Sequence, residues 1–498
     1  MRGDYTLSLR RSTLALAALL ALAIIRLWLM PLPSSFWTDE TSTAFVVRYG
    51  ASRASTPLLP GLIGSVYYSL PRAAVALGGF SEAACRLPST LAMGVALFLI
   101  ARLAARLIHP QAAWFAVFAC LALHGFNFQA ADARPYGLGT GVMAAGLWFL
   151  VQWLDRARWR GALLFVLFAA LLLPVHPLYW PFHLVFAGYA IARLISKDTG
   201  VTWLRAGGIF ALVALAVVPV PIEMLALARG ARAYVSSPLP GPKALLYAMR
   251  LVLPGACWLG AWLVSRLGHR SADAPAPQRS SLVLIAMWWL CPPVCLFAVS
   301  WLTGISVFVD RYYSLALPGA ALAGTALASR CIPSGMWKPL ALALGLGAVL
   351  LHGDWREAWP AHANMDWRGA ARAINQRGPG AATPIICPSP VVETRAPLWR
   401  PGYPLPSFLY APLAAYPVGG RVVPFPFATS PEAERLAAAL AQSALSDSAR
   451  FFVYGHRINA SFWENWFGRR PELAGWAARR LGPFGDVVVV EFDPPITR

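Results

Sequence analysis

Four short polar segments carry the residue types from which a catalytic site could be built. Each stands beside a long apolar stretch: Thr38-Asp39-Glu40, Asp132-Ala133-Arg134-Pro135-Tyr136, His176-Pro177 and Asp310-Arg311-Tyr312. Ionisable groups at the ends of membrane-spanning segments are costly, so they usually line a cavity or a ligand site. We therefore take these segments as the candidates for chemistry.

Asp39 and Glu40 are adjacent carboxylates, which suit general-base catalysis, metal coordination or both. In a helix their side chains diverge by about 100°, so we expect only one of them to face any given site. A second interpretation is that Thr38 or Asp39 caps a helix that continues toward Arg48. Spacing alone leaves both interpretations open.

Asp132, Arg134 and Tyr136 place a carboxylate, a guanidinium and a phenol within five residues. The guanidinium of Arg134 is suited to bidentate binding of a phosphate. The alternative is an interfacial ion pair between Asp132 and Arg134, with Tyr136 in the aromatic belt of a membrane protein.

His176 and Arg311 each stand at the end of an apolar stretch. A lone histidine at such an end is often an interfacial polar residue rather than a ligand. Arg311 follows Asp310 at an end predicted to face outward, where arginine is uncommon. Its position therefore favours a functional role.

The composition is that of a membrane protein. Apolar residues make up 58% of the chain and charged residues 13%, with a mean hydropathy of +0.55, whereas a soluble domain carries about a quarter charged residues. The formal net charge is +20, but the basic residues stand singly or in small groups between apolar stretches. This pattern is typical of the inner loops of membrane proteins and argues against nucleic-acid binding.

About eleven stretches are long and apolar enough to cross a bilayer. They lie near 12–30, 86–108, 111–127, 136–153, 160–176, 178–195, 205–226, 243–266, 281–303, 311–330 and 337–352. Segment 57–79 is also apolar, but Pro57, Pro60 and Pro71 interrupt it. We predict that this segment is a helix on the outer membrane surface rather than another span.

Loop charges predict the orientation. With the N-terminus in the cytoplasm, every inner loop is basic, as the positive-inside rule requires. An odd number of spans then places the C-terminus outside. The sequence therefore predicts a multi-pass protein whose C-terminal part lies in the periplasm or its equivalent.

From Asp354 onward the pattern changes to that of a small α/β domain. Short strands are predicted near 381–387, 421–427, 450–454 and 486–492, with a helix at 431–443. The predicted division is a transmembrane unit, 1–352, and a soluble domain, 353–498. Trp399, Tyr403 and Trp463 are candidates for exposed aromatic side chains that stack on sugar rings, although simple packing is the preferred interpretation.

The order of these segments resembles that of the bacterial GT-C membrane glycosyltransferases of the family 39 type. Relatives of that type are protein O-mannosyltransferases and the aminoarabinose transferase that acts on lipid A. The similar elements are Asp39-Glu40, the stretch SEAACRLPS at 81–89, DARPYGL at 132–138, His176, Arg311-Tyr312 with Leu317-Pro318, and DWRGAA at 366–371. No Walker loop, GxSxG or HExxH motif appears, which excludes the chemistries that depend on them.

The resemblance implies an inverting transfer of a hexosyl or pentosyl group from a polyprenyl-phosphate carrier. Asp39 is then the candidate base, with Glu40 beside it, and Asp132 assists or helps Asp39 to hold a divalent ion. The same comparison makes Arg134 and Arg311 candidates for the lipid phosphate, and Tyr136 and His176 for orienting the sugar or the phosphate. The acceptor is a glycan, a lipid or a protein at the outer face of the bacterial inner membrane.

Two other functions remain open on the sequence. One is a transporter or flippase of lipid-linked sugars, which would need charged residues along a continuous path across the bilayer. The other is a non-catalytic assembly protein in which Asp39 and Arg134 hold loops together. The need for a metal and the identity of the sugar are not determined by the sequence.

Overall fold

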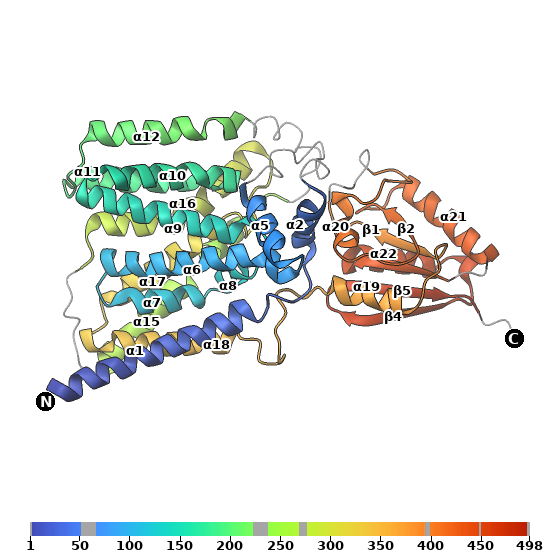
Figure 1. Cartoon of the computed structure of the whole chain (residues 1–498), viewed down its shortest axis with the longest axis horizontal. Coiled ribbons are helices and arrows are strands. Elements are labelled where there is room, and N and C mark those ends of the chain that lie inside the picture. Colours follow the sequence, from blue (N-terminus) through green and yellow to red (C-terminus); the bar gives the residue numbers. More distant parts are fainter. Residues whose placement is uncertain are drawn as a thin grey trace.

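A computed structural model shows a bundle of helices with a small sheet domain at one end (Figure 1). It describes residues 2–50, 66–222, 238–267, 276–392, 394, 399–447 and 450–495. The N-terminus lies at the end of the bundle that faces away from the sheet domain (Figure 1). This arrangement agrees with a membrane protein that presents its C-terminal part at one face.

The bundle is built from apolar segments that satisfy their backbone hydrogen bonds internally, as a bilayer requires. Its helices are α1 (Arg2–Ile24, continued by a π-helical turn at Ile25–Leu29), α6 (Glu82–Leu107), α7 (Ala112–Leu121), α8 (His124–Ala130), α9 (Pro135–Arg156), α10 (Trp159–Val175), α11 (Pro181–Ile195), α12 (Trp203–Val217), α14 (Pro242–Ala248), α15 (Val252–Leu267), α16 (Arg279–Thr303), α17 (Leu317–Ser329) and α18 (Trp337–His352).

Each of the predicted apolar stretches contains at least one of these helices, but their lengths differ. Among the described residues, five helices are long and apolar enough to cross a membrane, and up to seven if each bent pair is one span. The bent pairs are α7 with α8, at 82°, and α14 with α15, at 50°. Helices α10, α12, α17 and α18 are apolar but shorter, so the count of about eleven spans stays a prediction.

Two short helices lie between the bundle and the sheet domain. Helix α2 (Thr38–Tyr49) follows the loop after α1, and α5 (Ser69–Gly78) precedes α6 (Figure 1). The surface helix predicted at 57–79 coincides with α5 only in part, because residues 51–65 lie outside the described part of the chain. Leu77, at 91% exposure, is an apolar side chain that a membrane surface would cover.

The C-terminal domain, from α19 to β5, is a five-stranded mixed sheet with helices. The strands are β1 (Pro384–Pro388), β2 (Arg421–Phe425), β3 (Phe451–His456), β4 (Ala477–Phe484) and β5 (Val487–Asp493), in the order β2-β1-β3-β5-β4. Strand β1 pairs in parallel with β2 and β3, whereas β5 is antiparallel to β3 and β4. Helices α19 (Trp367–Gln376), α20 (Ala411–Ala415), α21 (Pro431–Asp447) and α22 (Arg457–Gly468) complete the domain.

The alternation of side chains along the strands divides the core of this domain in two. Ile385 and Phe452 pack with Trp367 of α19, while Ile386 and Val453 belong to the cluster that contains Trp463 of α22. The strands predicted from the sequence are therefore present, but α19, α22 and the exposed edge strand β4 had not been predicted. Strand β4 is mostly exposed, lacks alternation and carries Gly and Pro, which explains why its pattern was weak.

The aromatic residues proposed for sugar stacking belong to the core. Trp399 and Trp463 are 3% and 1% exposed, and the Trp399 indole donates to the Pro424 carbonyl. Tyr403 is half-buried against the same cluster. The packing interpretation is thus correct for the two tryptophans, and the expectation of exposed stacking residues is wrong for them.

Arg26, near the end of the first helix, holds the linker 353–366 that joins α18 to α19. Its guanidinium donates to four carbonyls of the linker, those of Gly353, Asp354, Glu357 and Ala358, at 2.6–2.8 Å. A buried arginine that satisfies carbonyls left free at a helix end is a stable arrangement. The linker is therefore fixed at the end of the bundle that carries the C-terminal domain (Figure 1).

Candidate active site

Asp39 and Glu40 lie in the first turn of α2 and have different partners. Asp39 Oδ2 is 3.6 Å from Arg311 Nη1. Glu40 Oε2 instead accepts the backbone N–H of Trp37 at 3.1 Å, so Glu40, rather than Thr38 or Asp39, satisfies the start of the helix. Of the two adjacent carboxylates, Asp39 is directed toward Arg311, whereas Glu40 is directed toward Arg86 and Asp132.

Glu40 forms a buried ion pair with Arg86 of α6. Both side chains are fully buried, and Arg86 donates to Oε1 at 2.7 Å and to Oε2 at 2.5 Å. The backbone N–H of Ala133 also donates to Oε1, at 2.7 Å. Burial by itself would raise the pKa of Glu40, but the Arg86 guanidinium outweighs burial and holds the pKa below its ordinary value.

These contacts occupy both carboxylate oxygens of Glu40, and its catalytic role stays a prediction. Its oxygens accept hydrogen bonds from α2, α6 and the loop before α9, so they are fully used. Arg86 also donates to the carbonyls of Pro31, Leu32, Ser34 and Ser35. The importance of Arg86 was missed, although an arginine inside the apolar start of a predicted span was a usable signal.

Asp132 lies in the loop between α8 and α9 and is 1% exposed. Its Oδ1 accepts the indole N–H of Trp37 at 3.0 Å and lies 3.7 Å from His362 Nε2. Its Oδ2 is buried and makes no hydrogen bond. Burial raises the pKa of Asp132 above its ordinary value, although the neighbouring His362 opposes this shift.

His362 comes from the linker, more than two hundred positions after Asp132, and was not predicted as a site residue. Its backbone N–H donates to Ser34 Oγ at 3.0 Å, and its ring lies against Phe128 with centroids 4.1 Å apart. The side chain is 2% exposed. A single histidine in an irregular segment carries little signal in the sequence, since only the fold brings it to Asp132.

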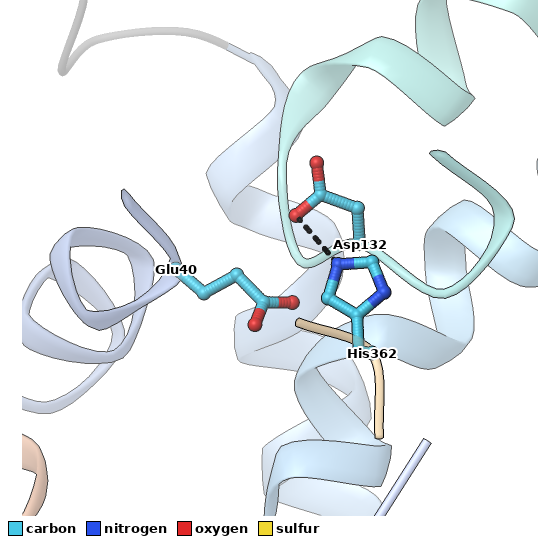
Figure 2. Close-up of side chains that lie close together, drawn as sticks. All are labelled: Glu40, Asp132 and His362. Carbon is cyan, nitrogen blue, oxygen red and sulfur yellow. Dashed lines mark ion pairs between the residues drawn. The ribbon is translucent and has the colours of Figure 1, made fainter. Parts of the chain in front are cut away.

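Glu40, Asp132 and His362 point toward a common space from α2, the loop before α9 and the linker (Figure 2). Each offers one ligand atom within 4.8 Å of the others. Glu40 is nevertheless saturated by Arg86 and backbone N–H groups, which leaves only two free ligand groups. Protein zinc sites use three or four, so these two groups alone do not complete a zinc site. Asp39 is not among the three residues, and a divalent ion held by Asp39 and Asp132 stays a prediction.

The fold brings four of the candidate side chains close together: those of Arg134, Tyr136, His176 and Arg311. Arg134 Nη1 donates to the backbone carbonyl of Asp39 at 3.2 Å, so its partner is not the Asp132 carboxylate of the alternative interpretation. The ring of His176 lies 5.7 Å from that of Tyr136 and 5.1 Å from that of Tyr312.

Several buried polar atoms of this group make no hydrogen bond: Arg134 Nε, Arg311 Nε, the Tyr136 hydroxyl and His176 Nδ1. Buried polar atoms without partners are uncommon in native proteins and mark places where a ligand or water binds. Burial, together with the positive charges of Arg134 and Arg311, lowers the pKa of His176 to about 3, so its imidazole is neutral at physiological pH. Two guanidiniums and a neutral imidazole form a good anion site.

A cavity of about 380 Å³ adjoins these groups. Its polar lining comprises Trp37, His124, Gln129, Asp132, Tyr136, Tyr247, Arg250, Asp310, Arg311, Tyr313 and Ser314. Asp310 is paired with Arg250 at 3.2 Å and accepts a hydrogen bond from the Tyr313 hydroxyl. The cavity therefore combines aromatic faces with hydrogen-bonding groups, which is the chemistry of a sugar site.

Comparisons with known proteins agree on the fold. Residues 66–222 match the family model described as dolichyl-phosphate-mannose-protein mannosyltransferase. The fold resembles the crystal structure of ArnT from Cupriavidus metallidurans in the apo state, at 12% identity over 95% of this chain and 97% of that one, with a TM-score of 0.56. The structure of the same protein bound to undecaprenyl phosphate aligns at 14% identity over the same shares, with a TM-score of 0.54. A comparison with curated proteins gave no match.

These findings confirm the predicted resemblance to GT-C membrane glycosyltransferases, in the fold over nearly the whole chain and in sequence over residues 66–222. The matched segment includes Arg86, Asp132, Arg134, Tyr136 and His176. The chain is accordingly a multi-pass membrane protein with this fold.

Proposed function

We propose that this protein transfers a sugar from a polyprenyl-phosphate carrier to an acceptor, with inversion at the anomeric carbon. The observation that carries the proposal is the grouping of one carboxylate with two guanidiniums. Asp39 Oδ2 is 3.6 Å from Arg311, and the Asp39 carbonyl accepts from Arg134. A base and an anion site thus stand side by side next to a cavity of sugar-binding character.

The reaction divides between these groups. The Asp39 carboxylate takes the proton of an acceptor hydroxyl, whose oxygen forms a bond to the anomeric carbon. The bond between that carbon and the phosphate oxygen breaks, and its electron pair leaves with the lipid phosphate. Arg134 and Arg311 stabilise the charge that develops there, which is the largest single contribution in many enzymes.

His176 and Tyr136 act on the donor, at its phosphate or its sugar. The neutral imidazole can accept or donate a hydrogen bond without repelling a second cation, and the Tyr136 hydroxyl is free to do the same. Both side chains are buried, so their hydrogen bonds to a phosphate or sugar oxygen would form in a region of low dielectric, where they are strong.

A lipid-linked donor and an outward-facing reaction are supported by independent observations. The fold is that of ArnT, which has been crystallised with undecaprenyl phosphate. The candidate residues lie at the end of the bundle that carries the C-terminal domain, and the basic loops predicted to be cytoplasmic lie at the other. We therefore assign the reaction to the outer face of a bacterial inner membrane, with a glycan, lipid or protein as acceptor.

The distribution of charge argues against a transporter. The described middle of the bundle is apolar, with residues such as Leu97, Phe118 and Leu150 in its core. A second charged group, Asp155 with Arg193, lies near the opposite helix ends. The two groups are separated by the apolar core, whereas a transport path would need polar residues between them.

The proposal is tested by incubating the purified protein with membrane extract and a panel of radiolabelled polyprenyl-phosphate sugars, with and without a chelator. Asp39→Asn is expected to lower the transfer rate by about 100-fold or more, because the acceptor hydroxyl loses its base. Loss of transfer in the presence of the chelator would indicate that a divalent ion takes part in the reaction.

The matched control is Asp486→Asn, which removes a carboxylate from the surface of the C-terminal domain. It should transfer label like the wild type. If the wild type moves no label from any donor, or if Asp39→Asn is fully active, the proposed function is wrong and transport or assembly becomes the better account.

A further inference from the structure

Another cavity lies on the C-terminal domain and shares no lining residue with the cavity of the candidate active site. It has a volume of about 460 Å³ and is lined by Phe462, Asn465, Trp466, Arg469 and Arg470. These residues belong to the second half of α22 and to the two positions that follow it. Because positions four apart lie on the same face of a helix, Phe462 stands beside Trp466 and Asn465 beside Arg469.

Two aromatic side chains form the apolar part of this cavity. Phe462 is 42% exposed. Trp466 is half-buried, and its ring packs against those of Trp463 and Phe467, with centroids 5.7 and 5.0 Å apart. Both neighbours belong to the core, so the orientation of Trp466 is fixed before any ligand binds. A fixed aromatic side chain loses little conformational entropy on binding.

Two guanidiniums form the charged part. The guanidinium carbon of Arg470 lies 3.6 Å from the centre of the Trp466 ring, and Arg469 is exposed. In the ranges that the structure describes, no carboxylate forms an ion pair with either arginine. The carboxylate of Glu464, on the same helix, is occupied by Arg480 at 2.5 and 2.7 Å. The cavity therefore carries two positive charges without a described counter-charge.

A ligand of this cavity must match both parts. Guanidiniums bind carboxylate and phosphate groups through paired hydrogen bonds, and aromatic rings bind the apolar face of a sugar ring. The Asn465 amide can donate to, or accept from, a hydroxyl. A stable protein partner usually contacts about 20–30 residues on each side, whereas five line this cavity. A small free anion would leave the aromatic rings unused.

We propose that this face of α22 is a binding site for an anionic glycan, separate from the candidate active site and independent of the proposed sugar transfer. The sugar rings pack on Phe462 and Trp466. A carboxylate or phosphate group of the glycan binds Arg469 and Arg470. Trp463, the candidate for sugar stacking in the sequence, supports Trp466 from the core instead.

The test is direct binding to the full-length protein in a neutral detergent, measured by isothermal titration calorimetry. The probes are a short oligogalacturonate with its uncharged methyl ester, and a phosphorylated malto-oligosaccharide with its unphosphorylated form. We expect each acidic probe to bind about 10-fold or more tightly than its uncharged counterpart, because the counterpart lacks the group that the guanidiniums hold. Added salt should weaken only the acidic probes, and the tighter of these two identifies the preferred anion.

Arg469→Gln/Arg470→Gln should weaken binding of the acidic probes by about 10-fold or more and leave the uncharged probes unaffected. Phe462→Ala should weaken both kinds of probe by the same factor, since the ring contacts the sugar rather than the anion. The matched control is Arg435→Gln/Arg479→Gln, which removes two exposed arginines of the same domain and changes the net charge equally. It should bind every probe like the wild type.

Equal binding of acidic and uncharged probes would overturn the inference, as would a loss in the control variant equal to that in Arg469→Gln/Arg470→Gln, or no effect of Phe462→Ala. Competition by inorganic phosphate as strong as that of the glycan would show a simple anion site and would overturn it too. Asp39→Asn should bind the probes like the wild type. Absence of glycan binding therefore leaves the proposed function standing, and loss of sugar transfer leaves this inference standing.

Discussion

At the scale of single residues, the side chains of the site differ in whether their buried polar atoms have hydrogen-bond partners. Arg134 and Arg311 keep buried nitrogens without partners, while Glu40 has no oxygen to spare. The first condition suits ligand binding and the second suits positioning. Two residues that looked alike in the sequence, Asp39 and Glu40, thereby have different partners.

Arg134→Lys is expected to lower kcat/KM for sugar transfer by about 100-fold. Lysine keeps the positive charge but loses the planar fork that can hold a phosphate and the Asp39 carbonyl together. Steady-state kinetics with the lipid donor measures the effect, and Arg435→Lys, at an exposed position of α21, is the control. Activity equal to that of the wild type would remove Arg134 from the phosphate site.

His176→Gln is expected to lower the rate without changing the shape of its pH profile between about pH 5 and 8. Because the pKa of His176 is lowered to about 3, the imidazole is already neutral throughout this range and would gain its proton only near pH 3. Glutamine is neutral as well. A pH limb near pH 6 that disappears in His176→Gln would show that the histidine is charged during the reaction.

At the scale of elements, the ion pair between Glu40 and Arg86 joins α2 to α6 and to the loop before α9. Because Glu40 also accepts the backbone N–H of Ala133, the same carboxylate fixes the backbone between Asp132 and Arg134. Helix α9 begins with Pro135 directly after an extended Arg134, a favoured start that fixes this arginine's backbone.

Glu40→Gln is expected to destabilise the protein by about 3–5 kcal/mol, because it leaves Arg86 charged and buried without a counter-charge. Since the folded-state pKa of Glu40 is lowered, its contribution is present above the unfolded pKa and is lost as the pH falls through the folded value. Near neutral pH, the titration of Glu40 should therefore cause no change in the melting temperature of the wild type.

Thermal unfolding in detergent at neutral pH measures this difference. The double variant Glu40→Gln/Arg86→Met should recover part of the loss, since an apolar side chain replaces the unpaired guanidinium. If the double variant loses more stability than the two single variants lose together, the assignment of a coupled pair is contradicted.

At the scale of the whole molecule, the C-terminal domain is bound to the loops that form the site. Arg368 of α19 pairs with Glu82 at 3.1 Å and donates to the Pro33 carbonyl, while the Tyr416 hydroxyl links Glu82 to the backbone of Phe36. Segments that are far apart in the sequence therefore come into contact at Phe36, three residues before Asp39. The division at 352/353 stays a prediction, and the linker that follows it brings His362 to 3.7 Å from Asp132.

Reversing the charge at Arg368 is expected to weaken this contact. Arg368→Glu should lower the transfer rate several-fold, because two carboxylates then face each other beside the loop that precedes Asp39. The swap Arg368→Glu/Glu82→Arg should recover most of the activity, and kinetics on the three variants measures it. Equal activity of all three would show that domain docking does not affect the site.

The sequence by itself determined the membrane class, the apolar helices and most strands, because hydrophobic runs and alternation are local properties. It also determined the candidates Asp39, Asp132, Arg134, Tyr136, His176 and Arg311, since ionisable groups beside apolar stretches are conspicuous. Their roles remain proposals, but the structure brings these side chains to one end of the bundle.

Only the tertiary structure decided which partner each of these groups has. Glu40 meets Arg86, which is 46 positions away, and Asp132 meets His362 from the linker. Such contacts depend on how helices and loops pack over the whole chain, and no local pattern encodes them. The contacts of Glu40 with Arg86 and of His362 with Asp132 join residues at long separations, which a linear sequence does not display.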